Sequence, residues 1–356
     1  MSNIIDYVST QFATFQEKPF NTVDSLVLSQ LSYIFFDNIT KDKKQISIGE
    51  LLKAEHFKKM FERVLNPDET KKLLFSAVAS PRFRNIKLCY YVNETDIKKE
   101  KQFSAVTYLL DKKTSYIAFR GTDQTFVGWK EDFNMAFISP VPSQIDALNY
   151  LNFIAKKIRG NFYIGGHSKG GNLAVYSSLM SSSKIKDRII RIYSHDGPGF
   201  KENIFSCDEY KQIEHKIEKT LPQSSIIGML LQNQENYTIV KSKNNGIMQH
   251  DPFSWIVEKG HFIYQSKIDA YTTNKNNALN QWINSLTDEK RERFVECLYH
   301  IIKAGNIEYI SDMPKKWNSN IEAMLNAAKN LDEETKKFVY ETIKQLVVMY
   351  IKSFHL

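Results

Sequence analysis

The chain has 356 residues, of which 42% are hydrophobic and 25% charged, so it is long enough to bury a core without disulfide bonds. Its three cysteines are scattered and form no CxxC pair, which argues against a disulfide framework or a zinc site and favours a reducing, cytoplasmic compartment. The net charge of +8 comes from dispersed lysines without a zinc-finger pattern, RNP motif or basic tail, so we expect no nucleic-acid partner.

The first part of the chain, residues 1–82, is predicted to be helical and to pack on the core that follows. An Asn-Thr-Asp cluster opens a pattern of helical spacing over 21–36, and an Asn-Pro-Asp cluster opens another over 66–80. The chain has no basic stretch leading into an apolar one at its start and no run of about 18 apolar residues. We therefore expect no signal peptide and no integral membrane segment, and peripheral contact with lipid stays open.

The pattern changes to strands after residue 82. Three consecutive segments, 86–96, 102–111 and 114–121, are short, rich in β-branched and aromatic residues, and bounded by polar turn residues. Helices and apolar strands then alternate, which is typical of a mainly parallel sheet with crossover helices. The expected order is helix 142–158, strand 161–166, helix 169–182, strand 187–197, and weaker strands at 215–221 and 236–242.

The last part of the chain, residues 268–356, is again predicted to be helical and carries no group of residues that indicates chemistry. The sequence thus predicts three parts: a helical segment 1–82, an α/β core 83–267 and a helical extension 268–356. It predicts no metal and no organic cofactor, and it does not indicate an oligomeric state.

The stretch Gly166-His167-Ser168-Lys169-Gly170 fits the G-x-S-x-G pattern of a nucleophile elbow. The turn from strand to helix in such an elbow is so tight that only small residues fit two positions before and after the serine. Here the pattern follows a predicted strand and opens a predicted helix, which is the context that makes it specific. The alternative is a glycine-rich turn whose serine caps the helix.

The segment "FRGT" ends a predicted strand upstream of the elbow and supplies a candidate oxyanion hole. The backbone N–H and hydroxyl of Thr122 would meet the backbone N–H of Lys169 around the developing negative charge. Arg120 would brace this loop through a structural ion pair, and a plain strand-to-loop turn is the alternative. The Lys169 side chain is expected to point away from Ser168, so a Ser–Lys dyad is not expected.

Acyl transfer also needs a general base and an acid that orients it. His250, in the loop segment "MQHDPFSW", is the preferred base, and His261 is the alternative. Asp196, at the end of the strand that follows the elbow helix, is the preferred acid, although Asp-Gly is also a common turn. Asp251 is a poor orienter because adjacent side chains point apart. The resulting chain order of nucleophile, acid and base is that of α/β hydrolases.

Several of these motifs resemble known families. "AFRGT" followed by "GGHSKGGN" resembles the class 3, fungal-type lipases, whose equivalents run FRGT/S and GHSLGG. Together with "DSLVLSQLSYI", "DGPGF" and "QHDPFSW", they resemble a bacterial lipase-like α/β-hydrolase family of unknown function, over about residues 20–265. The resemblance implies an α/β-hydrolase fold with Ser168 as nucleophile, Thr122 in the oxyanion hole and His250 as base.

The sequence departs from the class 3 lipases in three places. Those lipases take their acid from an Asp-Ile-Val-Pro segment, where this chain has Ser225-Ile226-Ile227-Gly228. Either Asp196, one strand earlier, takes that role or the triad is incomplete. Lys169 stands where those lipases usually have leucine, and we expect no signal peptide although many of those lipases are secreted.

The sequence therefore predicts a serine esterase or lipase-like acyl hydrolase whose partner is a small-molecule acyl ester or a lipid. The replaced acid and the long helical extension motivate a second hypothesis, a binding or scaffold protein that keeps the hydrolase fold with little or no activity. Thioester cleavage or acyl transfer would use the same triad.

Overall fold

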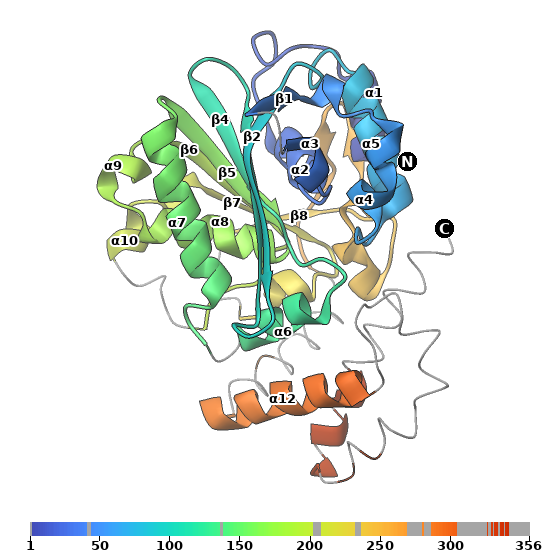
Figure 1. Cartoon of the computed structure of the whole chain (residues 1–356), viewed down its shortest axis with the longest axis vertical. Helices are drawn as coiled ribbons and strands as arrows, with labels where there is room; N and C mark the ends of the chain where they lie inside the picture. Colours follow the sequence, from blue (N-terminus) through green and yellow to red (C-terminus); the bar gives the residue numbers. More distant parts are fainter. Residues whose placement is uncertain are drawn as a thin grey trace.

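The computed structural model describes residues 2–40, 44–135, 138–201, 208–231, 236–268, 280 and 286–304, with scattered residues between 326 and 341. A central sheet runs in the order β1-β2-β3-β4-β5-β6-β7-β8-β11 (Figure 1). Its strands are β1 (Gln45–Ser47), β2 (Lys87–Asp96), β3 (Lys101–Leu109), β4 (Thr114–Phe119), β5 (Asn161–His167), β6 (Ile189–His195), β7 (Ile217–Pro222), β8 (Thr238–Val240) and β11 (Tyr264–Gln265). A separate short pair joins β9 (Val257–Glu258) and β10 (His261–Phe262).

Strand direction changes in the middle of this sheet. The strands from β1 to β4 pair antiparallel. Short polar turns connect β2, β3 and β4 as hairpins, while β1 joins the edge of the sheet from the N-terminal segment. The strands from β4 to β8 pair parallel, and β11 returns antiparallel to β8. The α/β-hydrolase fold predicted from the sequence is confirmed, but the sheet is mixed rather than mainly parallel, and its parallel half carries the elbow.

The crossover helices cover one face of the sheet. This layer holds α7 (Pro142–Lys157), α8 (Lys169–Met180), α9 (Ser183–Lys186) and α10 (Asp208–Lys211), with α6 (Phe126–Asn134) beside them at one end (Figure 1). The parallel strands follow one another in chain order, and right-handed crossovers between such neighbours all leave the sheet on the same side. The opposite face therefore needs a cover from elsewhere in the chain.

The N-terminal helices supply that second layer (Figure 1). They are α1 (Ile4–Thr10), α2 (Thr22–Leu31), α3 (Asp37–Thr40), α4 (Phe57–Phe61) and α5 (Pro67–Ala79). The hydroxyl of Tyr116 on β4 lies 2.9 Å from Ser25 Oγ and 2.7 Å from Ser29 Oγ of α2. A fully buried ion pair, Arg82 Nη2 to Asp24 Oδ2 at 2.6 Å, ties the end of this segment to α2. The segment is not helical throughout, since it also contributes the edge strand β1.

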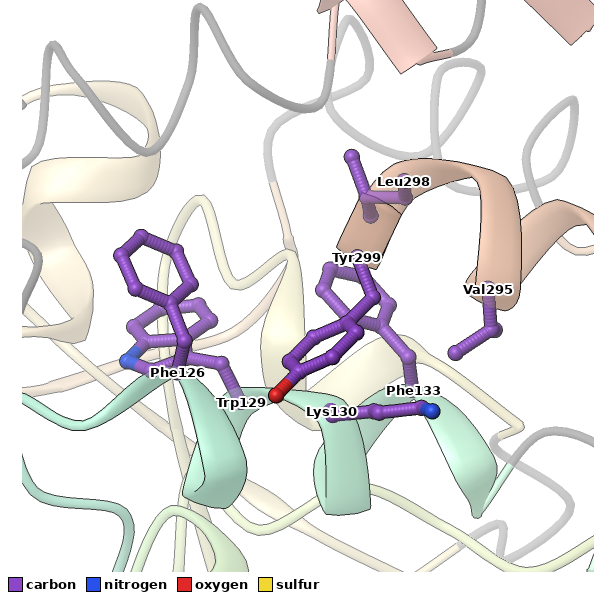
Figure 2. Close-up of a pocket in the computed structure, with 7 residues that line it drawn as sticks. All are labelled: Phe126, Trp129, Lys130, Phe133, Val295, Leu298 and Tyr299. Atoms are coloured by element: carbon purple, nitrogen blue, oxygen red, sulfur yellow. The ribbon is translucent and has the colours of Figure 1, made fainter. Parts of the chain in front are cut away.

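The helix α12 (Asp288–Ala304) belongs to the C-terminal part and lies against α6 (Figure 1). Figure 2 shows the pocket between the two helices, lined by Phe126, Trp129, Lys130, Phe133, Val295, Leu298 and Tyr299. The Lys130 ammonium lies 2.6 Å from both Glu100 and Glu296 and 4.5 Å from the centre of the Tyr299 ring. The sequence predicts a helical tail, and most of it lies outside the described residues. The domain boundaries at 82 and 267 stay predictions.

None of the described helices has both the length and the apolar character needed to traverse a bilayer.

Candidate active site

Ser168 lies between β5 and α8 with φ 58° and ψ −132°, a backbone conformation that non-glycine residues rarely adopt. Its N–H donates a 2.9 Å hydrogen bond to the His195 carbonyl of the neighbouring strand β6. A Cβ on Gly166 would lie 2.4 Å from the Gly170 carbonyl carbon, and a Cβ on Gly170 would lie 2.1 Å from the Phe119 carbonyl oxygen. The turn thus has the tight, strained geometry of a nucleophile elbow.

Asp196 and His250 meet at the carboxyl ends of the strands. The fully buried Asp196 carboxylate follows β6, and its Oδ2 lies 2.6 Å from His250 Nδ1. Its Oδ1 accepts hydrogen bonds from Ser225 Oγ at 2.5 Å and from the Gly228 N–H at 3.2 Å. Because Nδ1–H donates to the carboxylate, Nε2 of His250 is left as the proton acceptor.

His167, the residue before Ser168, holds the backbone of His250. Its Nε2–H donates to the His250 carbonyl oxygen at 2.9 Å, and its Nδ1 lies 3.1 Å from the Tyr33 hydroxyl. The two imidazole rings lie 4.6 Å apart between centroids. Burial lowers the pKa of His167 well below its usual value, so the ring is neutral. The elbow itself therefore positions the histidine that faces Asp196.

The Ser168 hydroxyl makes no hydrogen bond to His250 within the described part of the chain. Such a contact is often long in an unliganded hydrolase and shortens when substrate binds. The side chain of His250 keeps a small exposed surface, 16% of its full extent.

The loop after β4 lies against the elbow, as a Cβ on Gly121 would come within 3.2 Å of Ser168 Cβ. The backbone N–H groups of Thr122 and Lys169 have no hydrogen-bond partner among the described residues. The predicted brace also forms: Arg120 Nη2 lies 3.5 Å from Asp123 Oδ2 and 2.9 Å from Asn93 Oδ1.

Asp132 on α6 is a site residue that sequence reasoning missed. Its Oδ2 accepts a 2.5 Å hydrogen bond from the Thr122 hydroxyl, and its Oδ1 lies 3.9 Å from Lys169 Nζ. Burial raises the pKa of Asp132 to about 6, although Lys169 and the Thr122 hydroxyl act in the opposite direction. Nothing in the stretch "WKEDFN" distinguishes this aspartate from its charged neighbours, so only the fold reveals its contact with Thr122.

The two alternatives raised by the sequence lie in other surroundings. His261 is exposed on β10 and pairs with Glu258 in the small separate sheet. Asp251 accepts hydrogen bonds from Asn66 Nδ2 at 3.0 Å and from the Phe253 N–H at 3.1 Å. Within the described structure no hydrogen bond joins either side chain to the His250 ring. The described residues also include no group of three or more His, Cys, Asp or Glu arranged to hold a metal ion.

Comparison with known proteins agrees with the resemblance stated from the sequence. The model of the Mbeg1-like family matches residues 77–300. Among proteins of curated function, none matches the sequence. A Rhizomucor miehei lipase–propeptide complex is similar at 14% identity over 70% of this chain and 76% of the lipase, with a TM-score of 0.37. The M37 lipase is similar at 16% identity over 72% and 78% of the two chains, also with a TM-score of 0.37.

Proposed function

Because the chain belongs to the Mbeg1-like family and has the lipase-like α/β-hydrolase fold, we propose that it is a serine hydrolase that cleaves carboxylic esters. The observation that carries the proposal is the 2.6 Å contact between Asp196 and His250, formed beside a serine in elbow geometry. A buried carboxylate on the imidazole, together with a strained serine at the next strand end, is the arrangement that nucleophilic acyl transfer requires.

In the proposed mechanism Ser168 Oγ attacks the carbonyl carbon of the ester while its proton passes to His250 Nε2. Collapse of the tetrahedral intermediate breaks the bond to the leaving alcohol, which takes the proton back from His250. Water, deprotonated by the same imidazole, then hydrolyses the acyl-enzyme and frees Ser168. Asp196 keeps His250 in the required tautomer and stabilises the imidazolium as it forms.

The proposed oxyanion hole consists of the backbone N–H groups of Thr122 and Lys169. Both are unpaired in the described structure, and Lys169 adds the N-terminal end of α8, where negative charge is favoured. The hydroxyl of Thr122 donates to Asp132, so its proton is not free while that carboxylate is ionised.

The alternative of an inactive scaffold rests on the serine at position 225 and on the long helical extension. Ser225 donates to Asp196, and Asp196 faces His250, so the replaced acid no longer favours that alternative. The proposed substrate is a small-molecule acyl ester or a lipid. The cytoplasmic compartment stays a prediction from the sequence, and thioesters or acyl acceptors other than water would use the same residues.

The test is covalent labelling of the nucleophile. A fluorophosphonate probe is expected to label the wild-type protein at Ser168 and to leave Ser168→Ala unlabelled, with loss of p-nitrophenyl butyrate hydrolysis. Ser183→Ala, on α9, is the matched control and should label normally. A folded wild-type protein that neither labels nor hydrolyses p-nitrophenyl esters of any chain length would contradict the proposal.

A further inference from the structure

A buried ion pair lies directly behind the elbow. Lys169 is the first residue of α8 and its side chain is 1% exposed, while Glu131 on α6 is fully buried. Lys169 Nζ lies 2.9 Å from Glu131 Oε2, 2.9 Å from the Gln102 carbonyl oxygen and 3.1 Å from Gln102 Oε1. An ammonium group has three donors, so these contacts satisfy all of them.

Glu131 also links the ion pair to β3 and to the start of α7. Its Oε2 also accepts the Gln102 N–H of β3 at 3.0 Å, and its Oε1 accepts the Ser143 N–H at the start of α7 at 2.9 Å. The position of α6 relative to the elbow helix is therefore set by directional, charge-assisted hydrogen bonds and not by apolar packing alone.

The residue after Glu131 leads to the proposed oxyanion hole. Asp132 Oδ2 accepts the Thr122 hydroxyl, while its buried Oδ1 has no hydrogen-bond partner in the described structure. The side chain of Lys169 is thus connected through α6 to Thr122, one proposed oxyanion donor. The backbone N–H of Lys169 is the other.

We propose that the Lys169 side chain is a positioning residue that fixes the two halves of the oxyanion hole relative to each other through Glu131 and α6. The inference rests on the proposed function. It also gives a reason for lysine at a position where class 3 lipases usually have leucine, since a leucine side chain cannot bond to Glu131 or Gln102.

The test removes the ion pair without leaving one buried charge alone. Lys169→Met combined with Glu131→Gln deletes both charges and keeps similar side-chain volumes, and such replacements of buried ion pairs are often tolerated. Lys186→Met is the matched control, because Lys186 is another buried lysine. Among the described residues its ammonium bonds near α10, at 3.4 Å from both the Glu209 carbonyl oxygen and Gln212 Oε1.

We expect kcat for p-nitrophenyl butyrate to fall about 10- to 100-fold in the double variant, with KM within about threefold of wild type. The affinity for phenylboronic acid, which forms a tetrahedral adduct with the serine, is expected to fall by a similar factor. Active-site titration with the fluorophosphonate corrects for any misfolded fraction. The control variant should match wild type in all three measurements.

A folded double variant with wild-type kcat and wild-type affinity for the boronic acid would overturn the inference. Amide hydrogen exchange provides an arm that does not depend on activity: α6 should exchange faster in the double variant than in wild type, and unchanged exchange would also overturn it. Failure of the wild type to label or turn over an ester is a different result, which removes the proposed function itself.

Discussion

Asp196 reaches His250 from a backbone conformation with φ 50°, in the left-handed region that aspartate tolerates better than most residues. Its N–H donates to the Thr220 carbonyl of β7 at 2.8 Å, which fixes the turn at the end of β6. The carboxylate is then contacted by three donors from two segments, Ser225 and Gly228 after β7 and the ring of His250. These contacts fix the position of the carboxylate that faces the imidazole of His250.

The identity of the acid can be tested by comparing two aspartates. Asp196→Asn keeps the shape of the side chain but stabilises the wrong tautomer of His250, so we expect kcat to fall by about 10⁴-fold. Asp251 is adjacent to His250 in the sequence, but its carboxylate accepts hydrogen bonds from Asn66 and Phe253. Asp251→Asn is therefore expected to keep activity within about threefold of wild type. Steady-state hydrolysis of p-nitrophenyl butyrate distinguishes the two, and equal losses would contradict the assignment.

Asp251 also gives a prediction about stability and pH. Burial raises the pKa of Asp251 to about 6, against about 3.9 in an unfolded chain. The folded protein therefore binds this proton more tightly. The resulting stabilisation is fully present below about pH 4 and is lost as the pH rises through about 6.

Asparagine cannot ionise, so the stability of Asp251→Asn relative to wild type should increase between pH 4 and pH 7.5. We expect the difference in the free energy of unfolding to change by on the order of 1–3 kcal/mol, measured by urea denaturation at both values. Asp132 titrates in both proteins, so its effect on the free energy of unfolding cancels in the difference between them. Asp187→Asn, at an exposed position, serves as the control, and a difference that does not vary with pH would refute the prediction.

At the scale of elements, α6 is held from two sides. Its inner face carries Glu131 and Asp132 toward the elbow, and its outer face packs against α12 across the pocket of Figure 2. Lys130 anchors the outer contact through Glu100 and Glu296. The helix that carries the proposed oxyanion-hole support is therefore also the docking surface for a helix of the C-terminal part.

The contribution of α12 can be measured with two alanine substitutions on opposite faces of the same helix. Leu298 is 1% exposed, and Leu298→Ala is expected to remove about 2–5 kcal/mol of packing energy. Amides of α12 and of α6 should then exchange faster with solvent. His300→Ala, at a side chain that is 71% exposed, is the control. Equal exchange in both variants would show that the α6–α12 contact does not stabilise either helix.

At the scale of the whole molecule, the sequence predicted those helices, strands and turns that short-range sequence features specify on their own. The capping boxes of Asn21 with Asp24, the short hairpin strands and the glycine-flanked Ser168 are all local features. The N-terminal helical layer on the second face of the sheet could not be predicted in detail. It depends on contacts between these helices and strands that lie far away in the sequence, such as those of Ser25 and Ser29 with Tyr116. The helix α6 was missed since its apolar side faces a partner more than 150 residues away.

The candidate site follows the same division. Ser168, Asp196 and His250 each lie in a short motif at a strand end or in a loop, so a role for each could be proposed from residue type and spacing. Asp132, Tyr33 and the Lys169–Glu131 pair depend on contacts between distant segments. The residue types of Asp132, Tyr33 and Glu131 are those of an ordinary helix surface or core. Lys169 stands out in the sequence, but its buried partner does not.

The hydrogen bond from Ser225 to Asp196 also bears on how such a site can change during evolution. In the class 3 lipases the acid stands at the position that corresponds to Ser225, one strand beyond Asp196. In this chain the Ser225 hydroxyl bonds to the Asp196 carboxylate, so the two positions lie side by side. An aspartate at position 225 would place a second carboxylate against Asp196. Two like charges at such a distance favour sharing one proton, so a site with both aspartates would still hold an acidic group beside His250.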